Sequence, residues 1–337
     1  MTTTPTTTRR NLLTDIPGIS VGHAADARLA SGVTCILFDE AVIAACDVRG
    51  GGPGTRETDL LDTGRTVEKV DAIALAGGSA FGLDACAGVQ AYLREQDRGF
   101  AVRDVRVPIV PGAILFDLLN GGDKTWDRFP PYRELGYAAA AAAKPGDFAL
   151  GSVGAGLGAT TVNLKGGLGS ASAVTEDGLT VAALAAVNAA GSATVGDGPC
   201  FWAGPFEQNG EFGGQGFPGK MPGDALLTNT KGMHRTSTTL VVVATDAALG
   251  RTHAKRLATM AQDGLARALY PVHTPLDGDI VFAVATGQRI IGDPVMGLTR
   301  LGAVAAHVVA RAIARGVHEA TALPFSGALP SWRDRYA

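Results

Sequence analysis

Residues 235–246 are Arg235-Thr236-Ser237-Thr238-Thr239-Leu240-Val241-Val242-Val243-Ala244-Thr245-Asp246. The β-branched and apolar run predicts a buried strand over residues 239–245. Three hydroxyl residues stand directly before this strand, at the end of a long loop. Because Ser and Thr often occupy strand starts, composition alone favours an ordinary strand start here.

Helices and strands alternate downstream of this stretch. The patterns predict a helix over residues 252–269, a strand over residues 279–285 and a final helix. Asp293 is the expected N-cap of that last helix, with Pro294 in its first turn and Gly316 as its stop. Its expected buried face is formed by Val295, Leu298, Leu301, Val304, Val308 and Ile313.

The same alternation is present upstream. Helices are expected over residues 79–99, with Ser79 as the cap, and over residues 132–143. Strands are expected over residues 34–38, 41–48, 72–76, 148–153, 170–174 and 179–187. A loop rich in Gly and Pro then runs from residue 191 to about residue 235, longer than compact domains usually allow, which indicates a functional or mobile segment. Alternating strands and helices predict a layered α/β or α+β fold.

Two glycine-rich stretches resemble known motifs incompletely. Gly154-Ala155-Gly156-Leu157-Gly158 follows an apolar run, as a dinucleotide fingerprint does, but its third glycine comes one residue early and no helix follows. Gly78-Ser79-Ala80-Phe81-Gly82 differs from a nucleophile elbow because Phe81 stands where that motif needs glycine. The N–H groups of Gly78 and Ser79 are candidates for holding an anion or an oxyanion.

The acidic and histidine residues give a second candidate site. Leu276-Asp277-Gly278-Asp279 places two carboxylates around a turn glycine at the head of a strand, which is equally typical of a solvated turn. None of the six histidines has HxH or HExxH spacing, so no metal site is expected. His273 lies four residues before Asp277, which keeps a Ser/His/Asp hydrolase open as an alternative.

Composition limits the function classes. The 337 residues are 46% hydrophobic and 18% charged, with 29 Lys and Arg against 32 Asp and Glu, so a nucleic-acid partner has no electrostatic basis. No apolar segment approaches the roughly 18 residues that span a bilayer, and residues 1–10 form a Thr-rich tail rather than a secretory signal. Four cysteines without CxxC spacing predict reduced, buried thiols. We therefore expect a cytoplasmic protein.

Several of these pieces together resemble the family of the L-aminopeptidase/D-esterase DmpA, the β-peptidyl aminopeptidases and the nylon-oligomer hydrolase NylC. The resemblance covers nearly the whole chain, and the order and spacing of its pieces make it specific. Its pieces are Leu13-Thr14-Asp15-Ile16-Pro17-Gly18-Ile19-Ser20-Val21-Gly22-His23, Asp47-Val48-Arg49-Gly50-Gly51-Gly52-Pro53-Gly54, Ala76-Gly77-Gly78-Ser79-Ala80-Phe81-Gly82-Leu83, the strand at Thr238 and Asp277-Gly278-Asp279.

The resemblance implies a self-cleaving hydrolase whose nucleophile is Thr238, released as a new N-terminus when the bond after Ser237 breaks. The new α-amino group, with a pKa near 7.7 to 8, is a base suited to neutral pH. Asn188 matches the asparagine that helps hold the nucleophile and the developing oxyanion. Asp277 and Asp279 match the pair that orients the nucleophile and meets the substrate amine.

The chain departs from the family pattern at two places. The family lysine falls on Asn163, with Lys165 two residues later, so the resemblance leaves open which of the two fills that position. A family tyrosine near the site falls on Phe116, which removes a hydroxyl from the substrate-binding or oxyanion region.

The resemblance further implies a four-layer α/β/β/α sandwich. It would be one domain over residues 1–337, cut into fragments 1–237 and 238–337, without a cofactor. Expected substrates are small peptides, amides or polyamide oligomers, and the expected assembly is a homotetramer of cleaved pairs. Two alternatives stay open: an ornithine-acetyltransferase-like enzyme that passes the acyl group to an amine, and a non-catalytic binding protein on the same fold.

Overall fold

The computed structural model describes residues 9–231 and 237–337. Residues 1–8 of the predicted N-terminal tail and residues 232–235 of the long loop therefore lie outside the described residues. The strands are β1 (Ile19–Asp26), β2 (Ser31–Val48), β3 (Thr55–Arg56), β4 (Lys69–Ala76), β5 (Phe100–Val102), β6 (Val105–Val107), β7 (Gly112–Ile114), β8 (Gly167–Val174), β9 (Thr180–Asn188), β10 (Thr238–Ala247) and β11 (Ile280–Arg289).

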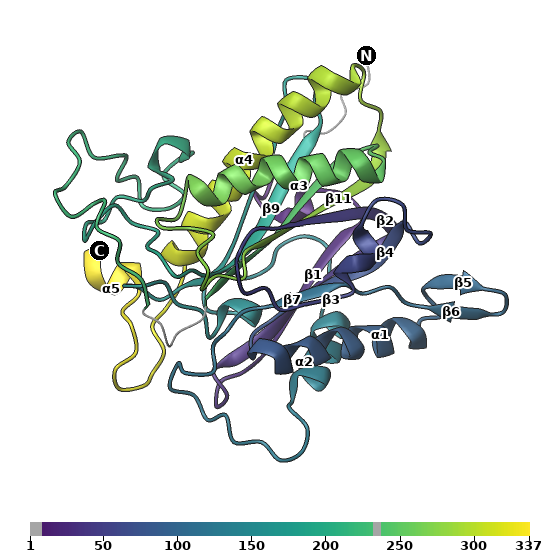
Figure 1. The fold of residues 1–337 in the computed structure, drawn as a ribbon, viewed down its shortest axis with the longest axis horizontal. Coiled ribbons are helices and arrows are strands. Elements are labelled where there is room, and N and C mark those ends of the chain that lie inside the picture. The colour runs from purple at the N-terminus through teal and green to yellow at the C-terminus, as the bar shows by residue number, and fades with distance from the viewer. Residues whose placement is uncertain (1–8, 232–236) are drawn as a thin grey trace.

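Helices lie on both sides of these strands: α3 and α4 on one side and α1 and α2 on the other (Figure 1). The α-helices are α1 (Ala85–Glu95), α2 (Tyr132–Ala141), α3 (Arg251–Ala266), α4 (Pro294–His318) and α5 (Trp332–Tyr336). Short 3₁₀ turns are η1 (Leu13–Asp15), η2 (Thr58–Leu61), η3 (Ser79–Asp84), η4 (Gly154–Gly156) and η5 (Gly204–Phe206).

Among the described residues, one nine-stranded mixed sheet runs in the order β3-β7-β4-β2-β11-β10-β9-β8, with β1 paired to β2. The long strand β2 joins its two halves. The first part of β2 pairs with β1 and β4, whereas the last part, from Ile43 to Val48, pairs with β11. The sheet therefore continues through β2 from one strand group to the other.

Three apolar cores in the described residues account for four layers. Along β10, Val241 and Val243 face the core under α3 and α4, whereas Leu240, Val242 and Ala244 face a second core. That second core also receives alternate residues of β2 and β4, and their other faces pack on α1 and α2 in a third core. Three cores separate helices, strands, strands and helices, so the expected α/β/β/α arrangement is confirmed.

The start of the first helix differs from the prediction. Ser79 does not cap an α-helix: it begins η3 at a φ of 53°, after Gly78 at a φ of 83°, and α1 starts only at Ala85. Residues 148–153 form no strand, and Gly151 only makes an isolated bridge to Leu168. The expected strands over residues 34–38 and 41–48 are one strand, β2, whose pairing with β4 shifts register between Leu37 and Val42.

Helix α4 corrects two further expectations. It continues through Gly316 to His318, because this glycine lets the helix approach β8: an added Cβ would lie 2.9 Å from the Gly169 nitrogen. Val295 is 73% exposed rather than buried, since it lies in the first turn. Among the described residues α4 alone is long and apolar enough to cross a membrane, a length not expected from the sequence; 61% of its apolar window is buried within the fold.

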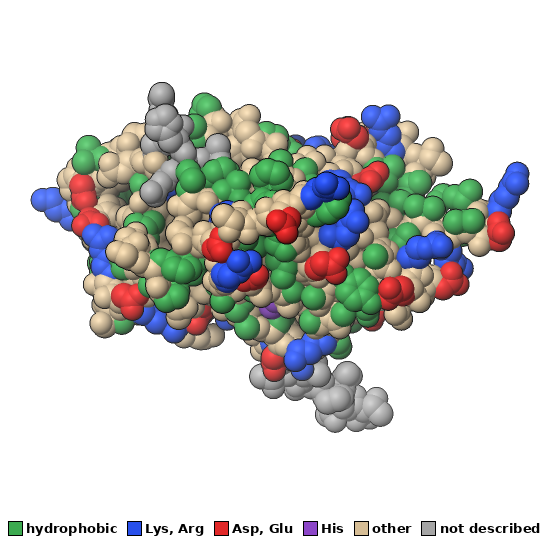
Figure 2. All heavy atoms as spheres, turned by 90° about the horizontal axis from the view of Figure 1, so that it is seen from below, with side chains coloured by type: hydrophobic (Ala, Val, Ile, Leu, Met, Phe, Trp, Pro, Cys, Tyr) green, Lys and Arg blue, Asp and Glu red, His purple; other side chains and the backbone are tan. Residues whose placement is uncertain are grey.

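The surface and the cysteines add little chemistry. On the face shown in Figure 2, basic and acidic side chains of the described residues are interspersed. Cys35, Cys46 and Cys86 are buried free thiols, and Cys200 is a half-buried one.

Candidate active site

Thr238 begins β10 in the middle of the sheet. Its antiparallel neighbour β9 ends at Asn188, and the two residues are direct partners across the ladder. On the other side, β11 runs parallel to β10 and follows the turn with Asp277 and Asp279. Thr238 is only 3% exposed and Asn188 only 1%. Strand register thus brings the predicted nucleophile, the Asn188 amide and the two carboxylates together where β9 ends and β10 and β11 begin.

The peptide bond between Ser237 and Thr238 is held on both sides. The Ser237 N–H donates to the Leu276 carbonyl at 2.9 Å, and the Gly278 N–H donates to the Ser237 carbonyl at 2.8 Å. The Thr238 hydroxyl also donates to the Ser237 carbonyl oxygen, at 2.5 Å. The hydroxyl therefore lies beside the carbonyl that it would attack, and a backbone N–H already binds that carbonyl oxygen.

Gly278 allows this close arrangement. A Cβ added there would lie 2.6 Å from the Thr238 Oγ1 and 2.8 Å from the Gly52 carbonyl oxygen. Gly50 packs equally tightly on the same turn, because a Cβ there would lie 2.3 Å from the Asp279 nitrogen. The glycine motif at residues 50–52 therefore supports the turn that carries the carboxylates.

Both carboxylates are buried and bonded to the backbone. Asp277 accepts from the Ala190 N–H at 3.0 Å and from the Thr274 N–H and hydroxyl at 3.0 and 2.7 Å. Asp279 accepts from the Thr239 N–H at 2.8 Å and from the N–H and ring Nδ1 of His273 at 3.1 and 3.0 Å. Burial, reinforced by the neighbouring Asp279 charge, raises the pKa of Asp277.

These contacts show what the two carboxylates do in the intact chain. Asp279 fixes the backbone directly after Thr238, and Asp277 ties the end of β9 to the turn. His273 pairs with Asp279 rather than with Asp277. In residues 9–231 and 237–337, no group of three or more His, Cys, Asp or Glu side chains is placed to hold a metal ion.

The Asn188 amide makes hydrogen bonds to three residues, two of which, Thr160 and Lys231, were not among the predicted site residues. Its Oδ1 accepts from the Thr160 N–H and from the Lys231 Nζ, both at 3.0 Å, and its Nδ2 donates to the Phe116 carbonyl at 2.9 Å. Lys231 also donates to the Thr160 carbonyl at 2.7 Å. No spacing in the sequence marked Lys231, which lies in the irregular loop.

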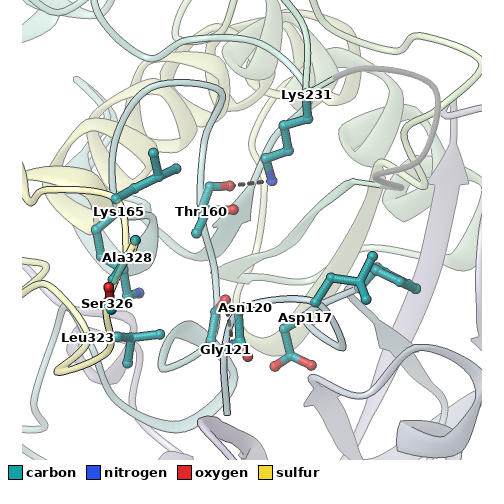
Figure 3. A pocket seen from close by; sticks show the side chains of 14 residues that line it. Asp117, Asn120, Gly121, Thr160, Lys165, Lys231, Leu323, Ser326 and Ala328 are labelled. Carbon is teal, nitrogen blue, oxygen red and sulfur yellow. Dashed lines mark hydrogen bonds between the residues drawn. The ribbon is translucent and has the colours of Figure 1, made fainter.

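A cavity of about 170 Å³ opens beside this amide (Figure 3). Phe116, Thr160 and Lys231, the three contacts of Asn188, all line it. Its remaining lining residues are Asp117, Leu119, Asn120, Gly121, Gly158, Lys165, Leu323, Ser326, Gly327, Ala328 and Leu329. The cavity wall is therefore connected to the end of β9 through the contacts of Asn188.

Lys165 lines the cavity but does not bond to Asn188. Its Nζ donates to the carbonyls of Gly156, Ala159 and Gly166 at 3.0, 2.8 and 2.7 Å. Burial lowers the pKa of Lys165 to about 7, and the Asp117 charge partly opposes that shift. The alternative candidate for the family lysine position also lies elsewhere: Asn163 accepts from the Ser192 hydroxyl at 3.2 Å and lines a separate cavity of about 320 Å³.

The remaining predicted residues lie behind the cavity or on its wall. Phe116 lines it, yet its contact with Asn188 comes from the backbone carbonyl, which any residue would supply. The N–H groups of Gly78 and Ser79, predicted to hold an anion, instead donate to the Asp117 carboxylate at 2.8 Å and the Leu115 carbonyl at 3.0 Å. Gly78 thus positions Asp117, which lines the cavity, whereas Ser79 and its partner Leu115 lie outside the cavity lining.

Comparison with known proteins finds relatives over nearly the whole chain. The model of peptidase family S58 matches residues 11–328. An uncharacterized aminopeptidase of Mycobacterium tuberculosis is 44% identical over 97% of this chain and 98% of its own length. A 6-aminohexanoate-oligomer endohydrolase of Kocuria sp. is 28% identical, covering 90% of this chain and 85% of its own.

A solved structure shares the fold. The L-aminopeptidase D-Ala-esterase/amidase of Ochrobactrum anthropi, described as a variant of the Ntn-hydrolase fold, superposes with a TM-score of 0.69 and 20% identity. The match covers 96% of this chain and 92% of that one.

Proposed function

Because the chain belongs to peptidase family S58 and is a hydrolase of peptide or other amide bonds, we propose that Thr238 is its nucleophile, freed by self-cleavage after Ser237. The observation that carries this proposal is the 2.5 Å contact between the Thr238 hydroxyl and the Ser237 carbonyl oxygen. The Gly278 N–H on the same oxygen supports it.

In the self-cleavage step, the Thr238 Oγ1 attacks the Ser237 carbonyl carbon. A C–O ester bond forms, the C–N bond breaks, and the departing nitrogen takes a proton to become the Thr238 amine. The Gly278 N–H, 2.8 Å from the carbonyl oxygen, stabilises the negative charge that develops there. Water then hydrolyses the ester and leaves a carboxylate on Ser237.

The same hydroxyl then acts on substrates. The new α-amine removes the proton from the Thr238 hydroxyl, whose oxygen attacks the substrate carbonyl carbon, and it returns that proton to the leaving amine. The acyl group is then bound to Thr238 as an ester, and water hydrolyses this ester to release the acid and restore the hydroxyl. Asn188 is the ladder partner of Thr238, and its side chain is proposed to help hold the nucleophile and the developing oxyanion. Asp279 fixes the backbone after the nucleophile through the Thr239 N–H, so its proposed role is orientation.

Substrate class and assembly are also proposals. By analogy with the relatives' names, we place the substrates among small peptides, amides and amide oligomers, and we propose that they bind at the 170 Å³ cavity. Fragments 1–237 and 238–337, a homotetramer of such pairs and a cytoplasmic location remain part of this proposal.

The test compares the intact mass of purified wild-type protein with that of a Thr238→Ala variant. We expect two fragments from the wild type, the smaller beginning at Thr238, and one uncut chain from the variant. An uncut wild type after prolonged incubation would exclude the self-cleavage mechanism. With cleavage established, release of acyl groups to water rather than to added amines separates a hydrolase from an acyl transferase.

A further inference from the structure

We propose that Lys231 is a positioning residue, whose ammonium holds the Asn188 amide in the orientation that the Thr238 reaction uses. The expected effect of Lys231 on the reaction rests on the proposed function, whereas its contacts with Asn188 and Thr160 do not. Lys231 lies seven residues before Thr238, in the segment directly upstream of the proposed cut.

The three contacts of Asn188 define one orientation of its amide. Two donors, the Lys231 ammonium and the Thr160 N–H, point at Oδ1, and one acceptor, the Phe116 carbonyl, faces Nδ2. Rotating the amide by 180° would place an NH₂ group against an ammonium and an N–H, and an oxygen against a carbonyl. In a side chain that is 1% exposed, such mismatches are costly.

Lys231 makes this arrangement charge-assisted. A hydrogen bond from an ammonium is stronger than one from a neutral donor, and the same Nζ also binds the Thr160 carbonyl at 2.7 Å. Figure 3 shows the Lys231 side chain pointing at Thr160, with their hydrogen bond drawn as a dashed line. One cation thus links the upstream loop, the turn at residue 160 and the end of β9.

The position of Lys231 in the chain shows which of the two proposed fragments orients Asn188. Asn188, Thr160, Phe116 and Lys231 all belong to the proposed fragment 1–237, whereas Thr238 begins the other fragment. The orientation of Asn188 is therefore set before the cut and does not need the new N-terminus. The same ammonium also ties Lys231 itself to the cavity wall through the Thr160 carbonyl.

The first test reads the amide directly in the uncleavable chain. In the Thr238→Ala background, ¹⁵N-asparagine labelling reports the side-chain NH₂ of Asn188, which an Asn188→Ser variant assigns. Adding Lys231→Met, which keeps the chain length and removes the ammonium, should shift both Asn188 NH₂ signals and speed their hydrogen exchange. Unchanged signals would overturn the positioning role, whether or not the wild type cleaves itself.

The second test reads the reaction. Lys231→Met should slow self-cleavage about 10- to 100-fold, the range expected for loss of a hydrogen bond to a charged group. Lys231→Arg, which retains a cationic donor, should recover most of the rate, and the exposed Lys220→Met in the same loop should match the wild type. Equal rates for Lys231→Met and wild type would contradict the proposal, whereas an uncut wild type would contradict the proposed function instead.

Discussion

The two sides of Asn188 are built differently. On the strand side, Thr238, Gly278 and Asp279 are held by ladder register and by backbone hydrogen bonds between adjacent strands and one turn. On the cavity side, Lys165 and Lys231 come from a turn and from an irregular loop, and each binds a different set of oxygens. The strand side therefore fixes the bond that is proposed to react, and the cavity side holds the Asn188 amide.

The two lysines make the difference concrete, because both line the same cavity. Lys165 is 1% exposed and surrounded by three backbone carbonyls, so its ammonium holds the turn together. Lys231 is half-buried and donates a hydrogen bond to the amide of Asn188, the ladder partner of the proposed nucleophile Thr238. The same residue type thus serves the fold in one place and the site in the other.

The largest expected effect is on the strand side, from Gly278→Ala. The added methyl group would lie 2.6 Å from the Thr238 Oγ1, so the hydroxyl or the turn must move. Because a displacement of about 1 Å at a reacting group costs on the order of 100-fold in rate, self-cleavage should slow at least that much. Intact-mass time courses measure it, with Gly292→Ala, where a Cβ meets nothing within 4 Å, as the control. A wild-type rate of self-cleavage in Gly278→Ala would show that the turn accommodates the methyl group without displacing the hydroxyl.

The second prediction compares how much Lys165 and Lys231 each contribute to the free energy of unfolding. Lys165→Met leaves three buried carbonyls without their donor, at about 1 kcal/mol for each lost hydrogen bond, so the free energy of unfolding should fall by about 2–4 kcal/mol. Lys231→Met should lower it by less than about 1 kcal/mol, because that side chain is half-buried. Urea unfolding in the Thr238→Ala background measures both. Equal losses would erase the distinction between the two lysines.

The third effect is the pH dependence of stability that Lys165 contributes. Burial lowers its pKa to about 7 in the folded chain, from 10.5 in the unfolded one. Between these values the unfolded chain binds more protons, so the free energy of unfolding should rise with pH and fall again as pH drops through this window. Lys165→Met should remove that part of the rise. An identical slope in both proteins between pH 7 and 10 would show that the three carbonyls keep the ammonium charged.

Strand patterns in the sequence predicted the layered fold, whereas the residues of the strand side of the site were predicted from the family resemblance. A β-branched run predicts a strand, and the ladder then brings the end of one strand beside the start of its neighbour, as with Asn188 and Thr238. Glycine was harder to interpret. Gly316 lies inside α4 because β8 approaches it closely, and such packing has no signal in a single sequence.

The cavity side could not be predicted in the same way. The resemblance left open whether Lys165 or Asn163 fills the position of the family lysine, because side-chain direction in an irregular turn depends on tertiary contacts. The Lys165 side chain points at three carbonyls within its own segment. Lys231 lies 43 residues after Asn188, and its ammonium donates to the Asn188 amide oxygen. A contact across so long a loop leaves no periodicity to detect.

The smallest expected effect tests the cavity wall with Phe116→Tyr, which restores the hydroxyl of the resembling family. The contact between Phe116 and Asn188 uses the backbone carbonyl, so the variant keeps it, and self-cleavage should stay within about twofold of wild type. The ring lines the cavity, so any change should appear in KM for an amide substrate rather than in kcat.

Self-cleavage time courses and steady-state kinetics of the same Phe116→Tyr preparation measure both quantities, with Phe116→Leu as the variant that also lacks a hydroxyl. If Tyr raises kcat tenfold while Leu does not, the hydroxyl reaches the reacting carbonyl from the cavity. The cavity side would then take part in the chemistry itself, and the division between a strand side that reacts and a cavity side that positions would have to be redrawn.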